Sequence, residues 1–132
     1  DFPDSETVNQ PGIIAIPHLG ASTEESEDNC AMMAADEIKD YLENGNITNS
    51  VNFPNCSLPS DKVGRVTIIH KNIPSVIAKF TDLLKDVNIS DMINKSKGDY
   101  AYTIINTDHT VSEETAKQLS ELDPVIAVRV IK

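Results

Sequence analysis

The apolar and polar positions in the second half of the chain switch between the period of a strand and the period of a helix. Residues 65–70 and 100–107 are rich in β-branched and aromatic residues, which is typical of strands. Residues 87–94 alternate between apolar and polar positions and predict a third strand. After the first strand, apolar residues recur at the spacing of one helix face: Val76, Ile77, Phe80, Leu83 and Leu84.

Beyond residue 107 the pattern predicts one more helix and a last strand. Ser112 is a favourable N-cap, and Glu113 and Glu114 in the first turn match the positive end of the helix dipole. Pro124 ends this helix, and residues 125–131 form the final strand. The order is therefore β-α-β-β-α-β, which is the ferredoxin-like arrangement of four strands with two helices on one face. We predict an α+β fold for this part.

The first sixty residues predict a strand, a long helix and a linker. Residues 13–16 (IIAI) predict a short buried strand. Ser22 and Glu25 have the spacing of a capping box, so we expect a helix over residues 23–43. Residues 44–64 contain several asparagines and prolines without a periodic pattern, and they predict a linker with a short strand around Ser50 to Phe53.

The charge of the chain is unevenly distributed. Residues 1–60 hold 11 acidic residues and one basic residue, a net charge of −10, whereas residues 61–132 hold 10 of each sign. We therefore predict two segments of different origin: residues 1–60 are a remnant of another region with its linker, and residues 61–132 are the ferredoxin-like domain. An acidic chain without a basic patch argues against nucleic acid and against anionic membrane surfaces as partners.

The remaining composition is that of a globular protein, with 39% hydrophobic and 24% charged residues. No apolar run is long enough to span a bilayer and no signal peptide is visible, which predicts a cytoplasmic location. The chain starts at Asp1, which predicts a fragment or a processed product. Cys30 and Cys56 are predicted to be reduced thiols, with a disulfide as the alternative. The three histidines lack ligand spacing with the cysteines, so we predict no metal site.

The junction between the strand at 65–70 and the next helix carries the polar residues that best fit a binding site. A helix start offers unpaired backbone N–H groups that attract carboxylates, and Pro74 suits its first turn. His70 and Asn72 add a ring nitrogen and an amide, so together they are able to bind a small zwitterion such as an amino acid. In the alternative interpretation, Asn72 only caps the helix and His70 is an ordinary strand-end residue.

Residues 65–132 resemble an ACT domain, a regulatory module that binds amino acids. The stretch 69–74 (IHKNIP), followed by residues 87–89 (VNI), resembles the ACT domain of D-3-phosphoglycerate dehydrogenases. Residues 17–23 (PHLGAST) resemble the segment that carries the catalytic histidine of D-2-hydroxyacid dehydrogenases, and residues 49–54 (NSVNFP) resemble the phosphoglycerate dehydrogenase linker. The resemblance covers nearly the whole chain and implies the C-terminal part of such an enzyme.

The resemblance assigns the first segment a role only in the full-length enzyme. His18 matches the acid/base that exchanges a proton with the substrate hydroxyl during hydride transfer, a task that suits the pKa of histidine. Gly20 would then lie near NAD. The dinucleotide fingerprint Gly-x-Gly-x-x-Gly is absent from the five glycines of the chain, so we expect the isolated chain to bind no cofactor and to be inactive. The parent enzyme would oxidise 3-phosphoglycerate at the entry to serine synthesis.

The resemblance also implies an effector site between two ACT domains. His70 and Asn72 would come from one subunit, and Asn88 and Ile89 from its neighbour, with L-serine or another amino acid bound between them. Because residues 87–94 lie on a sheet edge in this topology, we predict a homo-oligomer that pairs through these edges.

One residue departs from the family pattern. Glycine often follows the proline of this junction in the family, whereas this chain has Ser75, whose side chain would narrow the pocket or supply a new hydrogen bond. The alternative function is therefore an ACT domain that serves only as a dimerisation element without ligand binding.

Overall fold

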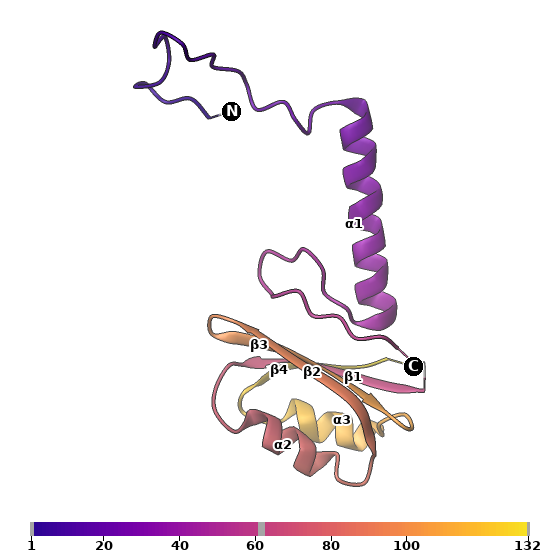
Figure 1. Ribbon diagram of the computed structural model, residues 1–132. Helices are drawn as coiled ribbons and strands as arrows, with labels where there is room; N and C mark the ends of the chain where they lie inside the picture. The colour runs from indigo at the N-terminus through magenta and orange to yellow at the C-terminus, as the bar shows by residue number, and fades with distance from the viewer. Residues whose placement is uncertain (1, 61–62, 132) are drawn as a thin grey trace. The chain divides into compact units, whose positions relative to one another are not determined.

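The structure, a computed structural model, describes residues 2–60 and 63–131 (Figure 1). It divides into two separate units, residues 1–36 and residues 37–132, and helix α1 (Glu24–Asn44) begins in the first unit and ends in the second. Six further elements follow α1: β1 (Gly64–Lys71), α2 (Val76–Leu83), β2 (Ile89–Lys97), β3 (Tyr100–Thr107), α3 (Glu113–Ser120) and β4 (Val125–Ile131). The boundary predicted between residues 60 and 61 separates two segments of different evolutionary origin, and it stays a prediction.

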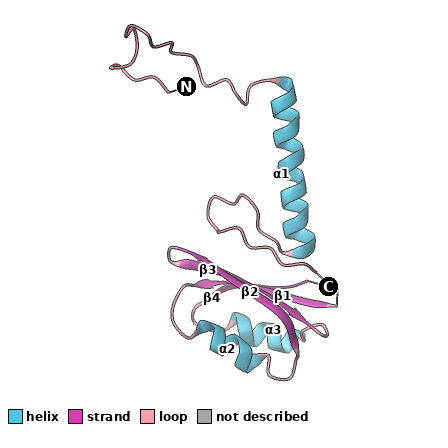
Figure 2. Cartoon of the chain, in the orientation of Figure 1, coloured by secondary structure: helices cyan, strands magenta, loops and turns pink. Residues whose placement is uncertain are grey.

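The four strands form one antiparallel sheet in the order β2-β3-β1-β4, and α2 and α3 cover one of its faces (Figures 1 and 2). β1 and β3 are the inner strands, whereas β2 and β4 are the edges. Gly98, with a φ of 60°, supplies the left-handed residue in the turn between β2 and β3. This topology confirms the predicted α+β, ferredoxin-like fold.

The larger core lies between the sheet and the two helices. Val66 and Ile68 of β1 are fully buried because alternate residues of a strand face the same side. The predicted stripe of α2 packs against them, with Val76, Phe80 and Leu84 also buried; the cluster is completed by Ile105, Val111 and Leu119. Ser112 caps α3 as predicted, because its hydroxyl accepts the N–H of Thr115. Full burial of each large apolar side chain is worth about 1.5–3 kcal/mol.

The opposite face of the sheet is covered by the segment between α1 and β1. Ile47, Cys56 and Leu58 of this segment are buried against Tyr102 and Ile104. An isolated bridge joins Ile47 and Cys56 within the segment, and the backbone groups of these two residues exchange two hydrogen bonds. The covering segment, residues 45–60, therefore acts as the outer layer of a second, smaller core.

The strand predicted around Ser50 to Phe53 is wrong. The hydroxyl of Ser50 accepts hydrogen bonds from the backbone N–H groups of Asn52 and Phe53, at 3.3 and 3.2 Å. A serine that satisfies the backbone in this way competes with sheet pairing and favours a turn. The asparagine-rich composition of residues 44–64 also favours turns, and the alternation of Val51, Asn52 and Phe53 is too short to indicate a strand.

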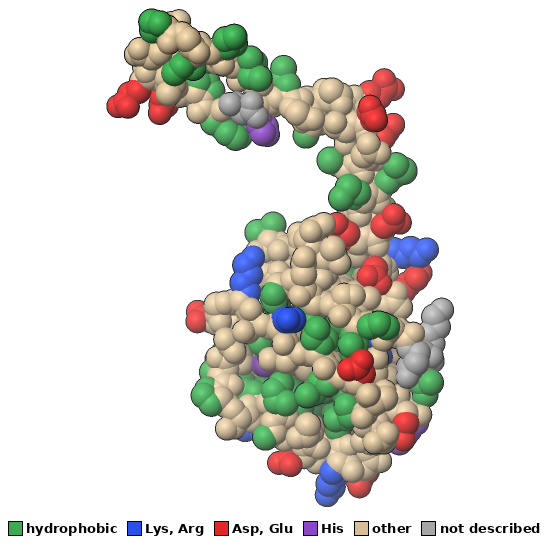
Figure 3. Space-filling view, viewed as in Figure 1, with side chains coloured by type: hydrophobic (Ala, Val, Ile, Leu, Met, Phe, Trp, Pro, Cys, Tyr) green, Lys and Arg blue, Asp and Glu red, His purple; other side chains and the backbone are tan. Residues whose placement is uncertain are grey.

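Two predictions for the first unit are also wrong. Residues 13–16 form no strand in the described part of this unit: the unit offers them no strand to pair with, and Ile14 is 89% exposed. Helix α1 starts close to the predicted position, but its N-cap is Thr23, whose hydroxyl accepts the N–H of Ser26 at 3.2 Å. Ser22 and Glu25 therefore do not form the predicted capping box. Acidic side chains still occupy the first turn of α1 (Figure 3).

Both cysteines are free thiols, Cys30 at the surface and Cys56 in the smaller core. Burial raises the pKa of the Cys56 thiol to about 11. Burial likewise raises the pKa of Tyr102 to about 12, against a smaller opposing effect of a hydrogen bond with the Thr67 side chain. No helix in the described ranges is long and apolar enough to cross a bilayer.

The buried Cys56 and Tyr102 predict that the fold weakens in alkali. Both groups stay protonated in the folded chain above the pH at which they ionise when unfolded, from ordinary pKa values of 9.0 and 10.0. The unfolded state therefore binds fewer protons, and the free energy of unfolding falls as the pH rises from about 9 to about 12. Urea unfolding followed by circular dichroism at a series of pH values measures this slope. Cys56→Ala should flatten its lower part, between pH 9 and 11; an unchanged slope there would show that the thiol does not contribute.

Candidate functional site

The predicted site residue Asn72 lies directly after β1 and is tied to the turn between β2 and β3. Its backbone N–H donates to the carbonyl of Asp99 at 2.8 Å, and its side-chain Nδ2 donates to the carbonyl of Gly98 at 3.1 Å. Asn72 therefore does not cap α2. Pro74 precedes the helix rather than entering its first turn, and the N-cap of α2 is Ser75, which makes no side-chain capping bond.

His70 ends up on the helix-facing side of β1, where its ring is 2% exposed. Phe80 of α2 contacts the ring edge-on, with 5.1 Å between ring centroids and 79° between planes. Nδ1 lies 2.9 Å from the carbonyl oxygen of Lys71, and Nε2 lies 2.9 Å from Oγ1 of Thr103 and 3.3 Å from Oδ1 of Asn94. Groups of its own chain thus contact both nitrogens and one side of the ring, and the functional role of His70 stays a prediction.

Asn88 and Ile89 lie at the start of β2, the end of this strand that is farther from Asn72. The Asn88 carbonyl accepts the N–H of Asp108 at 3.0 Å, and Ile89 opens β2 opposite Thr107. β2 has nine residues, so its start lies roughly 30 Å along the strand from the Gly98 turn that holds Asn72. Within one copy of the chain the structure therefore brings His70 close to Asn72 and keeps both away from Asn88 and Ile89.

His18 and Gly20, the residues assigned to the full-length enzyme, lie in the first unit. The His18 ring stacks on Phe2, with 4.6 Å between centroids and 22° between planes. Gly20 is exposed, and a Cβ built on it would meet nothing within 4 Å. The described part of this unit has no strand that a glycine-rich turn could join to α1, so these residues alone do not fit NAD. In the described ranges no cluster of histidine, cysteine and carboxylate side chains could hold a metal ion.

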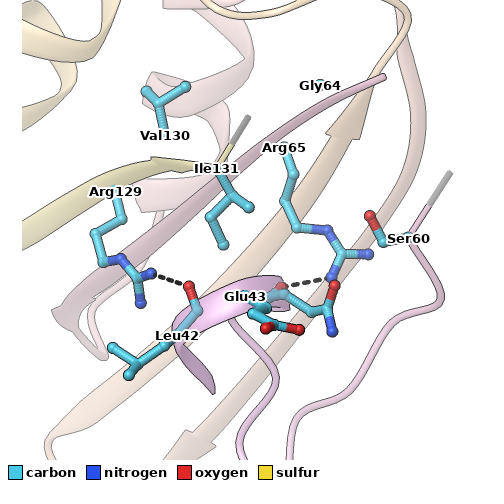
Figure 4. Close-up of a pocket in the computed structure, with 9 residues that line it drawn as sticks. Leu42, Glu43, Ser60, Gly64, Arg65, Arg129, Val130 and Ile131 are labelled. Carbon is cyan, nitrogen blue, oxygen red and sulfur yellow. Dashed lines mark hydrogen bonds between the residues drawn. The ribbon is translucent and has the colours of Figure 1, made fainter. Parts of the chain in front are cut away.

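Sequence reasoning missed a second polar centre, at the opposite end of β1 from His70 (Figure 4). Arg65 is 2% exposed, and its guanidinium donates to the carbonyls of Asn44, Leu58 and Pro59 at 2.6–2.7 Å and to Oδ1 of Asn106 at 2.8 Å. It thereby ties the end of α1 and the covering segment to the sheet. The available signal was a charged residue at the start of the predicted strand 65–70, directly before the apolar Val66.

Arg129 of β4 binds the same helix end from the neighbouring strand. Its guanidinium donates to the carbonyls of Tyr41 and Leu42, at 3.1 and 2.7 Å, and lies 5.0 Å from the centre of the Tyr41 ring. The last turn of α1 has no basic residue of its own, so Arg65 and Arg129 supply the positive charge that its free carbonyls favour. The two arginines border a cavity of about 430 Å³ (Figure 4). Their bonds to backbone carbonyls make this centre structural.

The fold and the junction define the class first: a ferredoxin-like, ACT-type domain with a polar cluster between β1 and α2, next to an open sheet edge. Comparison with known proteins then gives the particular likeness. D-3-phosphoglycerate dehydrogenase 1 of Saccharomyces cerevisiae is 33% identical over 135 residues, which cover 96% of this chain and 29% of that protein. The D-3-phosphoglycerate dehydrogenase of Dictyostelium discoideum is 33% identical over 122 residues, covering 92% of this chain and 30% of that enzyme. The Escherichia coli K12 enzyme is 28% identical over 123 residues, with coverages of 90% and 30%.

These matches confirm the resemblance to D-3-phosphoglycerate dehydrogenases that the motifs indicated, and they fit the predicted C-terminal part. The chain spans about three tenths of the length of these curated relatives. No protein-family model matches the chain. Among solved structures, the ACT domain of the GTP pyrophosphokinase of Chlorobium tepidum matches with a TM-score of 0.43 and 12% identity, covering 52% of this chain and 83% of that one.

Proposed function

We propose that this chain is the regulatory C-terminal part of a cytoplasmic, NAD-dependent D-3-phosphoglycerate dehydrogenase. Its ACT domain binds an amino-acid effector, L-serine, at the border between two copies, and the chain alone is catalytically inactive. In the parent enzyme, His18 serves as the acid/base of 3-phosphoglycerate oxidation and Gly20 lies near the cofactor. The observation that carries the effector assignment is the placement of Asn72 at the turn between β2 and β3, together with the contact of His70 with Asn94 of the open edge strand β2.

The charges of β2 support pairing with a second copy. In the proposed dimer, a two-fold axis relates the two β2 strands and passes near Ile93. This axis brings Asn88 and Ile89 of one copy to the Gly98 turn of the other. Antiparallel pairing about this axis places Asp91 of each copy opposite Lys95 of the other, so two opposite-charge pairs form on one face of the joined sheet. The same axis completes the site, because Asn88 and Ile89 of one copy then approach Asn72 of the other. A ligand held by both copies stabilises that arrangement, which is what regulation through an interface requires.

Calorimetry with L-serine tests the effector assignment. We expect heat of binding at millimolar serine and a clear loss of affinity in His70→Ala and Asn72→Ala. Asn52→Ala, an exposed asparagine of the covering segment, is the matched control and should bind as the unchanged chain does. Absence of heat from a chain shown to be a folded dimer would contradict effector binding.

The interface half of the proposal has its own test. Asp91→Lys should weaken the dimer in analytical ultracentrifugation because it sets like charges opposite each other. Adding Lys95→Asp to the same chain should restore it. A dimer that ignores both changes would place the interface elsewhere.

A second candidate function, dimerisation without a ligand, is favoured by the closed surroundings of His70 and by Ser75. Ser75 has a φ of 65°, a left-handed conformation that costs a side-chain-bearing residue about 1–2 kcal/mol. Ser75→Gly should therefore raise the free energy of unfolding by about 1 kcal/mol, measured by urea unfolding. If the serine side chain closes the site, the same variant should also gain a rise in melting temperature with L-serine that the unchanged chain lacks. An equal change in melting temperature with L-serine in both chains would show that the Ser75 side chain does not close the site.

A further inference from the structure

A set of hydrogen bonds joins three strands on the helix-facing side of the sheet. In the register of the sheet, Thr103 of β3 is opposite Asn94 of β2 and lies diagonally across from His70 of β1. Nε2 of His70 contacts both Oγ1 of Thr103 and Oδ1 of Asn94, and the Thr103 hydroxyl donates to the same Oδ1 at 2.9 Å. We name His70, Thr103 and Asn94 together the three-strand network.

The hydrogen atoms of this network are interdependent. The Lys71 carbonyl only accepts, so its 2.9 Å contact requires a proton on Nδ1 of His70. The Thr103 hydroxyl has a single proton and two acceptors within reach, Oδ1 of Asn94 and an unprotonated Nε2. The hydrogen-bonding state of the ring therefore depends on both Thr103 and Asn94.

Exposure differs within the network. His70 and Thr103 are buried, with 2% and 0% exposed surface, whereas Asn94 lies on the exposed edge strand. The network uses only Oδ1 of Asn94, and the two N–H donors of the same amide take no part in it. A molecule at the sheet edge is therefore able to contact Asn94 directly and to affect the buried ring through its Oδ1.

We propose that Thr103 and Asn94 are positioning residues that orient the His70 ring for the effector and connect the effector site to β2. This inference rests on the proposed effector role of His70. Thr103 sets the ring from within the sheet, and Asn94 transmits its orientation to the strand that borders the second copy. Loss of Thr103 removes the donor to Nε2, and loss of Asn94 leaves the Thr103 hydroxyl only Nε2 as an acceptor; either change alters the hydrogen bonding of the ring and weakens effector binding. Because Asn94 belongs to the pairing strand, effector binding and dimerisation then become coupled, and each strengthens the other by the same factor.

The test uses the full chain, L-serine as the probe and two readouts. Thr103→Val keeps the shape of the side chain and removes the hydroxyl, Thr103→Ser keeps the hydroxyl, and Asn94→Ala removes the amide at an exposed position. Thr67→Val is the matched control, because Thr67 is a buried threonine of the same sheet whose hydroxyl forms a hydrogen bond with Tyr102 instead of His70. The readouts are the dissociation constant of L-serine by calorimetry and the ¹⁵N chemical shifts of the His70 ring without ligand.

We expect the dissociation constant to rise about tenfold in Thr103→Val and in Asn94→Ala, and to stay within twofold in Thr103→Ser and Thr67→Val. The Nε2 shift of His70 should move in the first two variants and not in the last two. Unchanged ring shifts in Asn94→Ala, which alters an exposed residue and keeps the core, would overturn the inference. If the unchanged chain binds no serine, the effector proposal fails, and the ring shifts alone still decide whether Thr103 and Asn94 orient His70.

Discussion

We expect the replacement of Arg65 by methionine to lower the free energy of unfolding by about 3–5 kcal/mol. Methionine retains much of the apolar stem but removes the guanidinium that satisfies the carbonyls of Asn44, Leu58 and Pro59. A buried carbonyl without a donor is costly, as at Leu58, whereas the Pro59 carbonyl keeps a second donor in Nδ2 of Asn106. Together the three bonds hold the end of α1 and the covering segment on the sheet. Urea unfolding followed by circular dichroism gives the magnitude, and amide hydrogen exchange should show residues 45–60 opening first.

Arg129→Met is the matched control for this change. Arg129 also donates to two backbone carbonyls, but it lies at the edge strand and is partly exposed, so water can replace it. The expected loss is about 1–2 kcal/mol. Equal losses in the two variants would show that burial of the Arg65 guanidinium adds nothing to the attachment.

The second large effect is expected at Gly64, the first residue of β1. A Cβ added there would lie against the backbone carbonyl of His109, 2.6 Å from its carbon atom, and 2.7 Å from Oγ1 of Thr107. The backbone of the loop after β3 cannot rotate out of the way as a flexible side chain does, so β1 and the loop must separate. Gly64→Ala should lower the free energy of unfolding by about 3 kcal/mol, measured by urea unfolding.

Gly98→Ala separates crowding from backbone conformation. A Cβ at Gly98 would meet nothing within 4 Å, but the residue has a φ of 60°. The expected loss there is about 1 kcal/mol, from left-handed strain alone. A loss at Gly64 no greater than at Gly98 would show that the loop after β3 yields more easily than its contacts indicate.

The sequence predicted the ferredoxin-like domain well because its strands and helices bury one face each. The stripe from Val76 to Leu84 and the β-branched run of β3 follow directly from periodicity. Prediction was wrong where a segment had an apolar run without a partner. Residues 13–16 look like a strand, but a strand exists only when another strand pairs with it, and the described residues 2–36 supply none.

The candidate site was predictable in part. The order of His70 and Asn72 identified the junction, and the topology identified β2 as an edge. The contacts of His70 with Thr103 and Asn94 depend on the register of three strands, which a local pattern does not specify. Arg65 was missed for a related reason: three of its acceptors are backbone carbonyls from two separate stretches, and sequence patterns reveal side chains, not the carbonyls they reach.

β1 joins the two polar centres of the domain, with Arg65 near its start and His70 near its end. It is hydrogen-bonded to β3 on one side and to β4 on the other, so it cannot slide past either neighbour without breaking both ladders. The distance from the His70 ring to the last turn of α1 is therefore fixed by the stiffness of the sheet. We therefore expect the effector proposed at His70 to act through a rotation of the whole sheet rather than through shear inside it.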